Sequence, residues 1–164
     1  MSVGNPLGLD TESKMLNQVQ HDEKAKYRRG ESVSKRFDEW NEIKKTAESN
    51  EKIANFRQKE IFVTNIGENV GFEQNGKGEQ FLRPVLIYKK FSSRLFLGIP
   101  LTKTVREGIF YHSFEFKEGI NSTALLSQIR LFDAKRLHYR VGMINKDDFE
   151  LVKGKLKTLL EVTP

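Results

Sequence analysis

The sequence predicts an α+β fold in which a compact barrel or rolled sheet of short strands precedes a C-terminal helix. Between residues 59 and 132, short apolar segments alternate with glycine-containing turns, a pattern typical of small barrels and rolled sheets. After residue 145, apolar side chains recur at helical spacing. The chain has 164 residues, a length that suits a single domain with one modest core.

Five segments are predicted as strands because each is short, apolar or alternating, and bounded by turn residues: 60–66, 84–89, 94–100, 110–116 and 123–132. The second and third are continuous apolar runs of the kind found in fully buried strands. In the fourth, Phe110, Phe114 and Phe116 share one face. In the fifth, Gln128 and Arg130 interrupt an apolar strand, and alternation places both on the same face.

A helical extension is predicted before the strands, over residues 34–55. Phe37, Trp40, Ile43 and Ala47 recur there at spacings of three and four, and Ser34 is a candidate N-cap. The apolar stripe needs a surface to cover, either the barrel or another chain. Residues 1–33 show neither strand nor helix periodicity and are interpreted as a disordered leader.

The C-terminal helix is predicted from its start signal and its stripe. Asn145 is a candidate N-cap, and Asp147 and Asp148 in the first turn suit the positive end of the helix dipole. One face carries the apolar residues Phe149, Val152, Leu156, Leu159 and Leu160.

The net charge of +6 is concentrated in the segment predicted to fold. Residues 59–164 carry 17 basic and 12 acidic side chains, a net +5, whereas residues 1–58 carry 11 and 10, a net +1. A basic domain is compatible with a polyanionic partner such as nucleic acid. The chain has no cysteine, signal-peptide pattern or run of apolar residues long enough for a membrane span, so we expect a soluble cytoplasmic protein without disulfides.

The usual catalytic motifs do not occur. The three histidines show no HxH or HxxxH spacing, so no histidine-based metal site is expected. No phosphate-binding loop with Lys-Ser/Thr and no GxSxG motif occurs either. An enzyme with this sequence has to use arginine, glutamate, threonine and serine.

Three segments contain such residues: 69–84, 99–102 and 127–133. The first is a glycine-rich loop with two acid–amide pairs, Glu73-Gln74 and Glu79-Gln80, that leads to Arg83 at the mouth of a strand. Such an arginine can hold a phosphate bidentately, but physical reasoning alone favours a hairpin in which the arginine forms a surface ion pair. In the second, Thr102 presents a hydroxyl where a strand ends. In the third, an Arg–Asp structural pair would explain the polar residues without any function.

Taken in order, these segments resemble the MazF/PemK toxin family. The matching motifs are Gly71-Phe72-Glu73-Gln74-Asn75-Gly76, Arg83-Pro84-Val85-Leu86, Pro100-Leu101-Thr102, and the run from Ser127 to Asp133. The resemblance covers roughly residues 59–162. It implies a small SH3-like β-barrel with helices packed on it, the fold that MazF, PemK and CcdB toxins share, and usually a homodimer.

The resemblance also implies a function and a site. Members of the family cleave single-stranded RNA without a metal or cofactor, and a cognate antitoxin neutralises them. By position, Arg83 matches the catalytic arginine, Thr102 the transition-state threonine and Glu73 the loop acid. Further residues are expected beside the RNA: Gln74, Glu79, Gln80, Lys103, Ser127, Gln128 and Arg130.

Two departures leave alternatives open. The loop is longer than in compact members, so either Glu73 or Glu79 could face the substrate. Leu125 and Ser127 stand where PemK-type members have an arginine and an aspartate. Leu125 and Ser127 leave open an inactive barrel that binds RNA or protein. A CcdB-like gyrase-binding toxin, which shares the fold but cuts nothing, is the other competing hypothesis.

Overall fold

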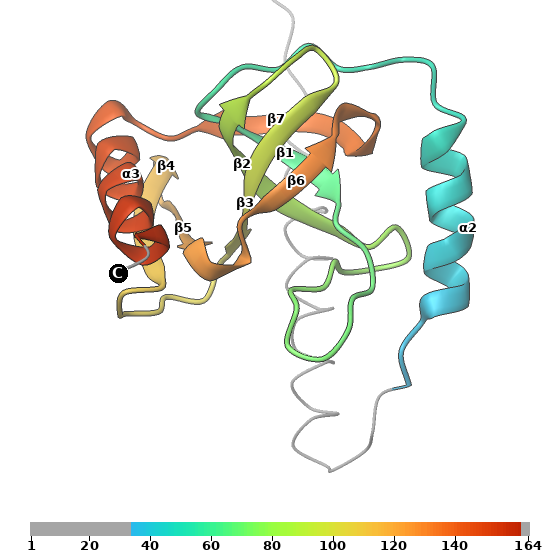
Figure 1. Ribbon diagram of the computed structural model, residues 1–164, viewed down its shortest axis with the longest axis horizontal. Helices are drawn as coiled ribbons and strands as arrows, with labels where there is room; N and C mark the ends of the chain where they lie inside the picture. Colours follow the sequence, from blue (N-terminus) through green and yellow to red (C-terminus); the bar gives the residue numbers. More distant parts are fainter. Residues whose placement is uncertain (1–33, 162–164) are drawn as a thin grey trace, which may run out of the picture. The chain divides into compact units, whose positions relative to one another are not determined.

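The computed structural model describes residues 34–161, and Phe37 onward forms one compact unit (Figure 1). The predicted leader, residues 1–33, lies outside the described residues. The elements in chain order are α2 (Phe37–Glu48), β1 (Glu60–Asn65), β2 (Leu82–Lys90), β3 (Leu95–Thr102), β4 (Tyr111–Lys117), β5 (Ile120–Leu125), a 3₁₀ turn η1 (Leu126–Gln128), β6 (Arg130–Asp133), a second 3₁₀ turn η2 (Ala134–Arg136), β7 (Leu137–Met143) and α3 (Lys146–Leu160). The predicted α+β fold with helices at both ends of the strand region is confirmed.

The strands form one antiparallel sheet in the order β4-β5-β3-β2-β1-β7, with β6 paired to β3 outside this path. Strand β3 changes its partner along its length. Leu95 to Gly98 pair with β6, whereas Leu101 and Thr102 pair with β5. Pro100, which has no backbone N–H to donate, lies at this changeover. Because the two ends of β3 pair with different strands, the sheet folds into two layers that share β3.

The predicted barrel is a rolled sheet that hydrogen bonds do not close. Among the described residues, β4 and β7 are the two ends of the strand order rather than neighbours. They meet instead through packing of the Phe116 ring on Gly142, where an added Cβ would lie 2.4 Å from the ring. A glycine is therefore needed at this contact, because any side chain would push the two end strands apart.

The core lies on both faces of β1, β2 and β3. Ile61, Leu86 and Ile99 face a cluster that contains α3, whereas the neighbouring residues Phe62 and Val85 face a second cluster. Phe56, Phe96, Phe132 and Leu137 complete that second cluster on the opposite face of the sheet. Burial on both faces explains why these strands are continuous apolar runs rather than alternating ones.

Two strand predictions need correction. Residues 123–132 do not form one strand, because β5 ends at Leu125 and the turn η1 separates it from β6. Strand β7 was not predicted at all. Only its first residue, Leu137, is buried, so its sequence lacks the apolar pattern that marks the other strands.

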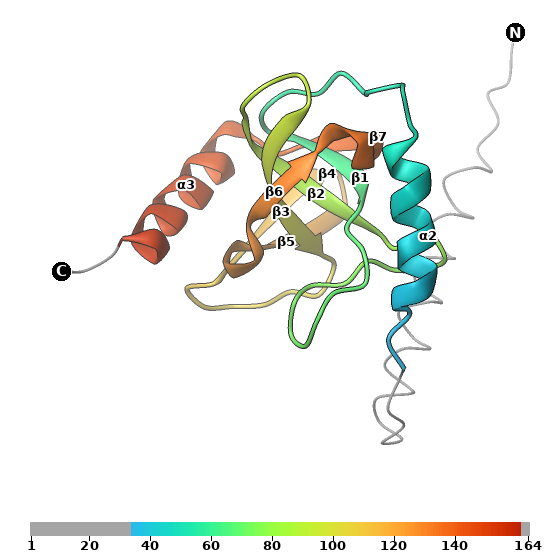
Figure 2. The same cartoon turned by 45° about the vertical axis from the view of Figure 1, so that its right-hand side comes forward.

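Helix α3 agrees with its prediction except at Leu160. The Asn145 side chain accepts a hydrogen bond from the Asp148 backbone N–H at 2.8 Å, the expected N-cap. Phe149, Val152 and Leu156 are buried in the first cluster, whereas Leu160 is 62% exposed. Figure 2 shows α3 and α2 on different sides of the sheet.

Helix α2 is shorter than the predicted span of 34–55. It begins at Phe37, so Ser34 is not its N-cap, and residues 50–58 are non-helical chain. Trp40 is buried, and its ring lies 5.6 Å from that of Phe81. The indole also covers Gly67, where an added Cβ would lie 2.5 Å from it. Through Trp40, the helix therefore packs against the start and the end of the loop between β1 and β2.

We expect Trp40→Ala to lower the free energy of unfolding by about 3–5 kcal/mol, the usual cost of removing a large buried aromatic side chain. Phe37→Ala is the matched control, because Phe37 lies on the same helix and is 45% exposed. Urea denaturation of both variants tests this. Equal midpoints for the two would contradict the assignment of Trp40 as the anchor.

Candidate functional site

Arg83 is a buried cation near the start of β2. It is only 7% exposed, so the alternative of a surface ion pair is wrong. Its Nε donates to the Asn75 carbonyl oxygen at 2.7 Å, and its Nη1 donates to the Leu101 carbonyl oxygen at 3.0 Å. The guanidinium thus connects the long loop to the end of β3.

Thr102 lies at the end of β3, beside Arg83. Val85 faces Pro100 across the two strands, and continuing this antiparallel register by two residues brings Arg83 opposite Thr102. The carbonyl that accepts from Arg83 also belongs to the peptide that joins Leu101 to Thr102. The half-buried Thr102 hydroxyl accepts a hydrogen bond from the Thr104 N–H at 3.3 Å. The structure therefore brings the predicted arginine and threonine together.

Gln128 holds the loop between β1 and β2. Its Oε1 accepts from the Gln74 N–H at 3.1 Å, and its Nε2 donates to the Phe72 carbonyl oxygen at 3.4 Å. These two bonds reach the backbone on both sides of Glu73. Gln128 lies in η1, the turn that interrupts the predicted strand, and it still faces the same loop as Arg130.

Two asparagines that the sequence did not single out fix the inside of the loop. The Asn69 side chain donates to the Gln74 carbonyl oxygen at 2.8 Å and accepts from Arg130 Nη1 at 3.4 Å. The Asn75 side chain accepts from the Asn69 N–H at 2.7 Å. Asparagine is common in loops because its side chain bonds to nearby backbone, and this preference was the available signal.

Gly76 in the Glu73-Gln74-Asn75-Gly76 motif has a steric role. A Cβ at this position would lie 1.9 Å from the Phe81 carbonyl oxygen, so no side chain fits. The Gly76 N–H donates to the Gly67 carbonyl oxygen at 2.7 Å. The loop returns on itself at this point, which lets Asn75 reach Arg83.

Glu73 is exposed at the outer side of this docked loop. One carboxylate oxygen accepts from the Val70 N–H at 3.1 Å, and the Glu73 N–H in turn donates to the Val70 carbonyl oxygen. The carboxylate is thus oriented by its own turn while the solvent still reaches it. Glu73 and Gln74 lie in the part of the loop that Arg83 and Gln128 hold.

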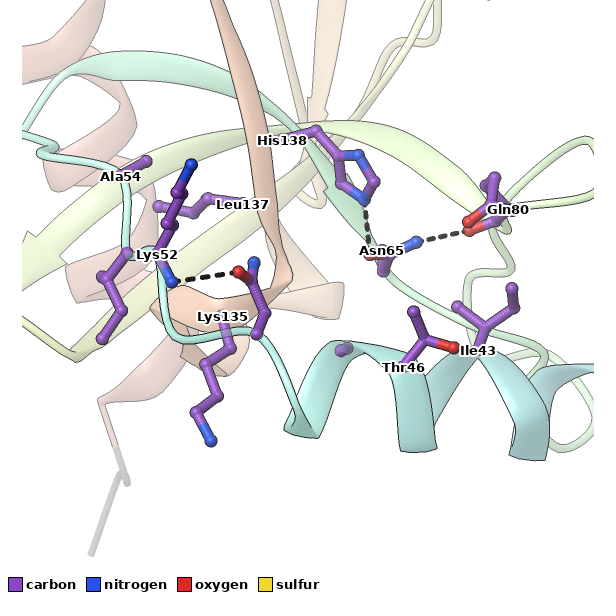
Figure 3. Close-up of a pocket in the computed structure, with 12 residues that line it drawn as sticks. Ile43, Thr46, Lys52, Ala54, Asn65, Gln80, Lys135, Leu137 and His138 are labelled. Carbon is purple, nitrogen blue, oxygen red and sulfur yellow. Dashed lines mark hydrogen bonds between the residues drawn. The ribbon is translucent and has the colours of Figure 1, made fainter.

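Gln80, the amide of the second acid–amide pair, lies elsewhere. The Gln80 carbonyl oxygen accepts from the Asn65 side chain at 2.6 Å, and Gln80 lines an open hollow of about 620 Å³ beneath α2. Asn65 follows Thr64, the partner of Arg83 on β1, so its side chain points to the opposite face of the strand. Figure 3 shows Asn65 between Gln80 and His138 in this hollow. The structure does not bring Gln80 to Arg83.

The remaining predicted residues are exposed to different degrees. Glu79, Lys103 and Ser127 are exposed, and Arg130 is half-buried. Leu125, one of the two departures from the PemK pattern, is buried in the sheet and packs rather than faces solvent.

A third arginine lies beside the loop. Arg136 donates to the Asn65 carbonyl oxygen at 3.3 Å, and its guanidinium lies over the Trp40 ring. Burial lowers the pKa of Arg136, and the nearby charge of Arg130 lowers it further, while Asp133 opposes the shift. Burial also lowers the pKa of His138. Arg83, Arg130 and Arg136 therefore all contact residues of β1 or the loop that follows it.

Within residues 34–161, no group of three or more histidine, aspartate or glutamate side chains is arranged to hold a metal ion. None of the helices in this described part is long and apolar enough to span a membrane.

Comparisons with known proteins find a matching family and structures with a similar fold. The family described as PemK-like, MazF-like toxin of type II toxin-antitoxin system matches residues 57–160. No curated protein matches the chain.

The fold is shared with solved structures, among them the following. MazF from Deinococcus radiodurans has a TM-score of 0.53 at 20% identity, over 67% of this chain and 98% of that one. A MazE-MazF structure from the same organism has a TM-score of 0.51 at 17% identity, over 69% and 100%. An endoribonuclease from a mycobacterial species has a TM-score of 0.51 at 12% identity, over 67% and 95%. With a family match over most of its length, the chain belongs to the PemK-like, MazF-like toxins of type II toxin–antitoxin systems.

Proposed function

We propose that the protein is an endoribonuclease that cleaves single-stranded RNA without a metal ion. The 2′-hydroxyl attacks the adjacent phosphorus, the bond to the 5′-oxygen breaks, and the products end in a 2′,3′-cyclic phosphate and a 5′-hydroxyl. This reaction needs a base for the 2′-hydroxyl, donors for the charged phosphorane and an acid for the leaving oxygen. The observation that carries the proposal is the hydrogen bond of the buried Arg83 guanidinium to the Leu101 carbonyl oxygen, at the strand end that carries Thr102.

Arg83 stabilises the negative charge of the phosphorane and protonates the leaving 5′-oxygen. Its bonds to Asn75 and Leu101 aim the planar group before the substrate arrives, and preorganised donors are the most effective kind. The Thr102 hydroxyl donates to a phosphoryl oxygen while it accepts from the Thr104 N–H.

Glu73 takes the proton of the 2′-hydroxyl. It is favoured over Glu79 because its backbone is held by Gln128 in the same part of the loop that Arg83 contacts, whereas Gln80, beside Glu79, lines the hollow beneath α2. Its carboxylate is oriented by the Val70 N–H and open to solvent. Gln74, Lys103, Ser127, Gln128 and Arg130 flank the bound strand.

A cognate antitoxin and a second copy of the chain are the proposed protein partners. The Deinococcus radiodurans MazF relative forms a MazE-MazF complex, and this chain spans nearly all of the relative's length. The net charge of +5 over residues 59–164 suits both RNA and an acidic antitoxin segment. The domain that acts is proposed to run from residue 59 to 162, with residues 34–55 as an extension.

Incubation of the protein with a long RNA in EDTA tests the proposal. We expect fragments with 5′-hydroxyl and 2′,3′-cyclic phosphate ends, because the reaction uses only side chains of the protein. Fragments with 5′-phosphate ends would contradict this mechanism. If the RNA stays intact and the protein stalls DNA gyrase in a separate assay, a CcdB-like toxin is supported instead.

We expect Arg83→Ala to abolish cleavage and Thr102→Val to lower kcat by about 10²–10³, the usual effect of losing one preorganised donor. Thr104→Val is the matched control, because Thr104 is exposed and joins the site only through its backbone. Single-turnover cleavage of a defined RNA measures these rates.

Because Arg83 is buried, circular dichroism and thermal melting must accompany the Arg83 variant, and the near-isosteric Thr102→Val keeps the test valid if Arg83→Ala is unfolded. Cleavage at the normal rate by a folded Arg83→Ala protein would show that the site is assigned wrongly.

We expect Gln128→Ala to speed amide hydrogen exchange at Gln74 and to lower kcat, since the loop that carries Glu73 loses both bonds to Gln128. Gln58→Ala is the control, because the Gln58 side chain also bonds a distant carbonyl, that of Tyr88 at 2.8 Å. An unchanged exchange rate at Gln74 in Gln128→Ala would show that other contacts hold the loop.

A further inference from the structure

Phe72 is the most exposed large apolar residue of the described chain. Its side chain is 103% exposed, so it contributes nothing to the core, and Val70 beside it is 70% exposed. Single exposed apolar residues are common on protein surfaces and by themselves indicate nothing. Phe72 differs because the backbone around it is held in place.

The backbone on both sides of Phe72 is fixed by hydrogen bonds. The Phe72 carbonyl oxygen accepts from Gln128, and the Gln74 N–H donates to the same side chain. The Glu73 N–H closes a turn on the Val70 carbonyl oxygen at 3.1 Å. The loop thus presents an aromatic ring to solvent and is already ordered. Binding to the ring therefore does not cost the conformational entropy of ordering the loop.

The surroundings of the ring suit a nucleic acid strand. Asn75, three residues after Phe72, contacts Arg83, and Asn69, three residues before it, contacts Arg130. Three residues span at most about 10 Å, so the ring lies within reach of a nucleotide held at Arg83. Aromatic side chains next to a cationic groove are the usual platforms on which single-stranded bases stack.

We infer that Phe72 stacks on a nucleobase beside the scissile phosphate and so positions the RNA strand over Arg83 and Thr102. The inference rests on the proposed function and adds a substrate-binding residue to it. Phenylalanine has no hydrogen-bonding group, so the stack does not read the identity of the base. Phe72 thus sets the position of the strand, and base preference comes from other contacts.

The test uses the full chain with Phe72→Ala, Phe72→Leu and Phe72→Tyr, and a short single-stranded RNA. Phe72→Ala is expected to raise KM about tenfold or more, because stacking on one base contributes a factor of that order. Phe72→Leu should lose most of the same effect, whereas Phe72→Tyr should retain wild-type KM, since only the aromatic face matters. Phe91→Ala is the control, because Phe91 is 52% exposed and also lies near a lysine, Lys89.

A second measurement separates this inference from the nuclease proposal. A single-stranded DNA oligonucleotide lacks the 2′-hydroxyl and is not cleaved, so its binding is measured without the reaction, and the difference between wild type and Phe72→Ala reports on the ring. The chain has one tryptophan, the buried Trp40, so the indole fluorescence of Phe72→Trp is measured against a constant background. We expect the oligonucleotide to quench the added signal, and Phe72→Ala to bind it about tenfold more weakly.

The outcomes are distinguishable. If wild type cleaves RNA and Phe72→Ala has the same KM and the same affinity for the DNA oligonucleotide, the inference is overturned and the nuclease stands. If Phe72→Leu equals wild type, the contact is not a stack and the inference fails. If no RNA is cleaved, the proposed function fails, and the DNA affinity alone decides the role of Phe72.

Discussion

The arrangement of the site depends on one buried guanidinium. A charge removed from water has to be supplied with hydrogen-bond partners, and the cost of leaving it unsatisfied is several kcal/mol. Arg83 reaches the Asn75 carbonyl on the loop and the Leu101 carbonyl on β3. These two hydrogen bonds therefore hold the loop and the end of β3 in fixed positions relative to each other. The Leu101 carbonyl belongs to the peptide that precedes Thr102, so the same bond holds the arginine at the strand end that carries Thr102.

Polar side chains, rather than apolar ones, dock the loop between β1 and β2. Asn69, Asn75 and Gln128 supply most of the bonds that hold residues 69–75. Amide side chains can satisfy backbone groups on the inner side of a loop without requiring an apolar outer side. The outer side is thus free to present Glu73 and Phe72 to solvent. The loop is ordered and accessible at once, a combination that suits a binding surface.

The two faces of β1, β2 and β3 pack against different parts of the chain. One face packs on α3, and the other packs on Phe56, β6 and Leu137. Helix α2 reaches the loop through Trp40, which covers Gly67 and Phe81 at the two ends of the loop. The N-terminal extension therefore supports the candidate site indirectly, because it holds the two ends of the loop in place.

Local information in the sequence determined β1, β2, β3 and α3, because burial on both faces gives continuous apolar runs and Asn145 caps its own helix. Through the family resemblance, the order of the motifs also predicted that Arg83, Thr102 and Glu73 form one site. Only the tertiary structure decided that β5 and β6 are separated at Leu126–Gln128, that β7 pairs with β1, and that Gln80 faces away from Arg83. These features depend on contacts between residues distant in sequence. The Gln128 side chain, for example, reaches a loop 54 residues earlier in the chain, and no local pattern encodes such a contact.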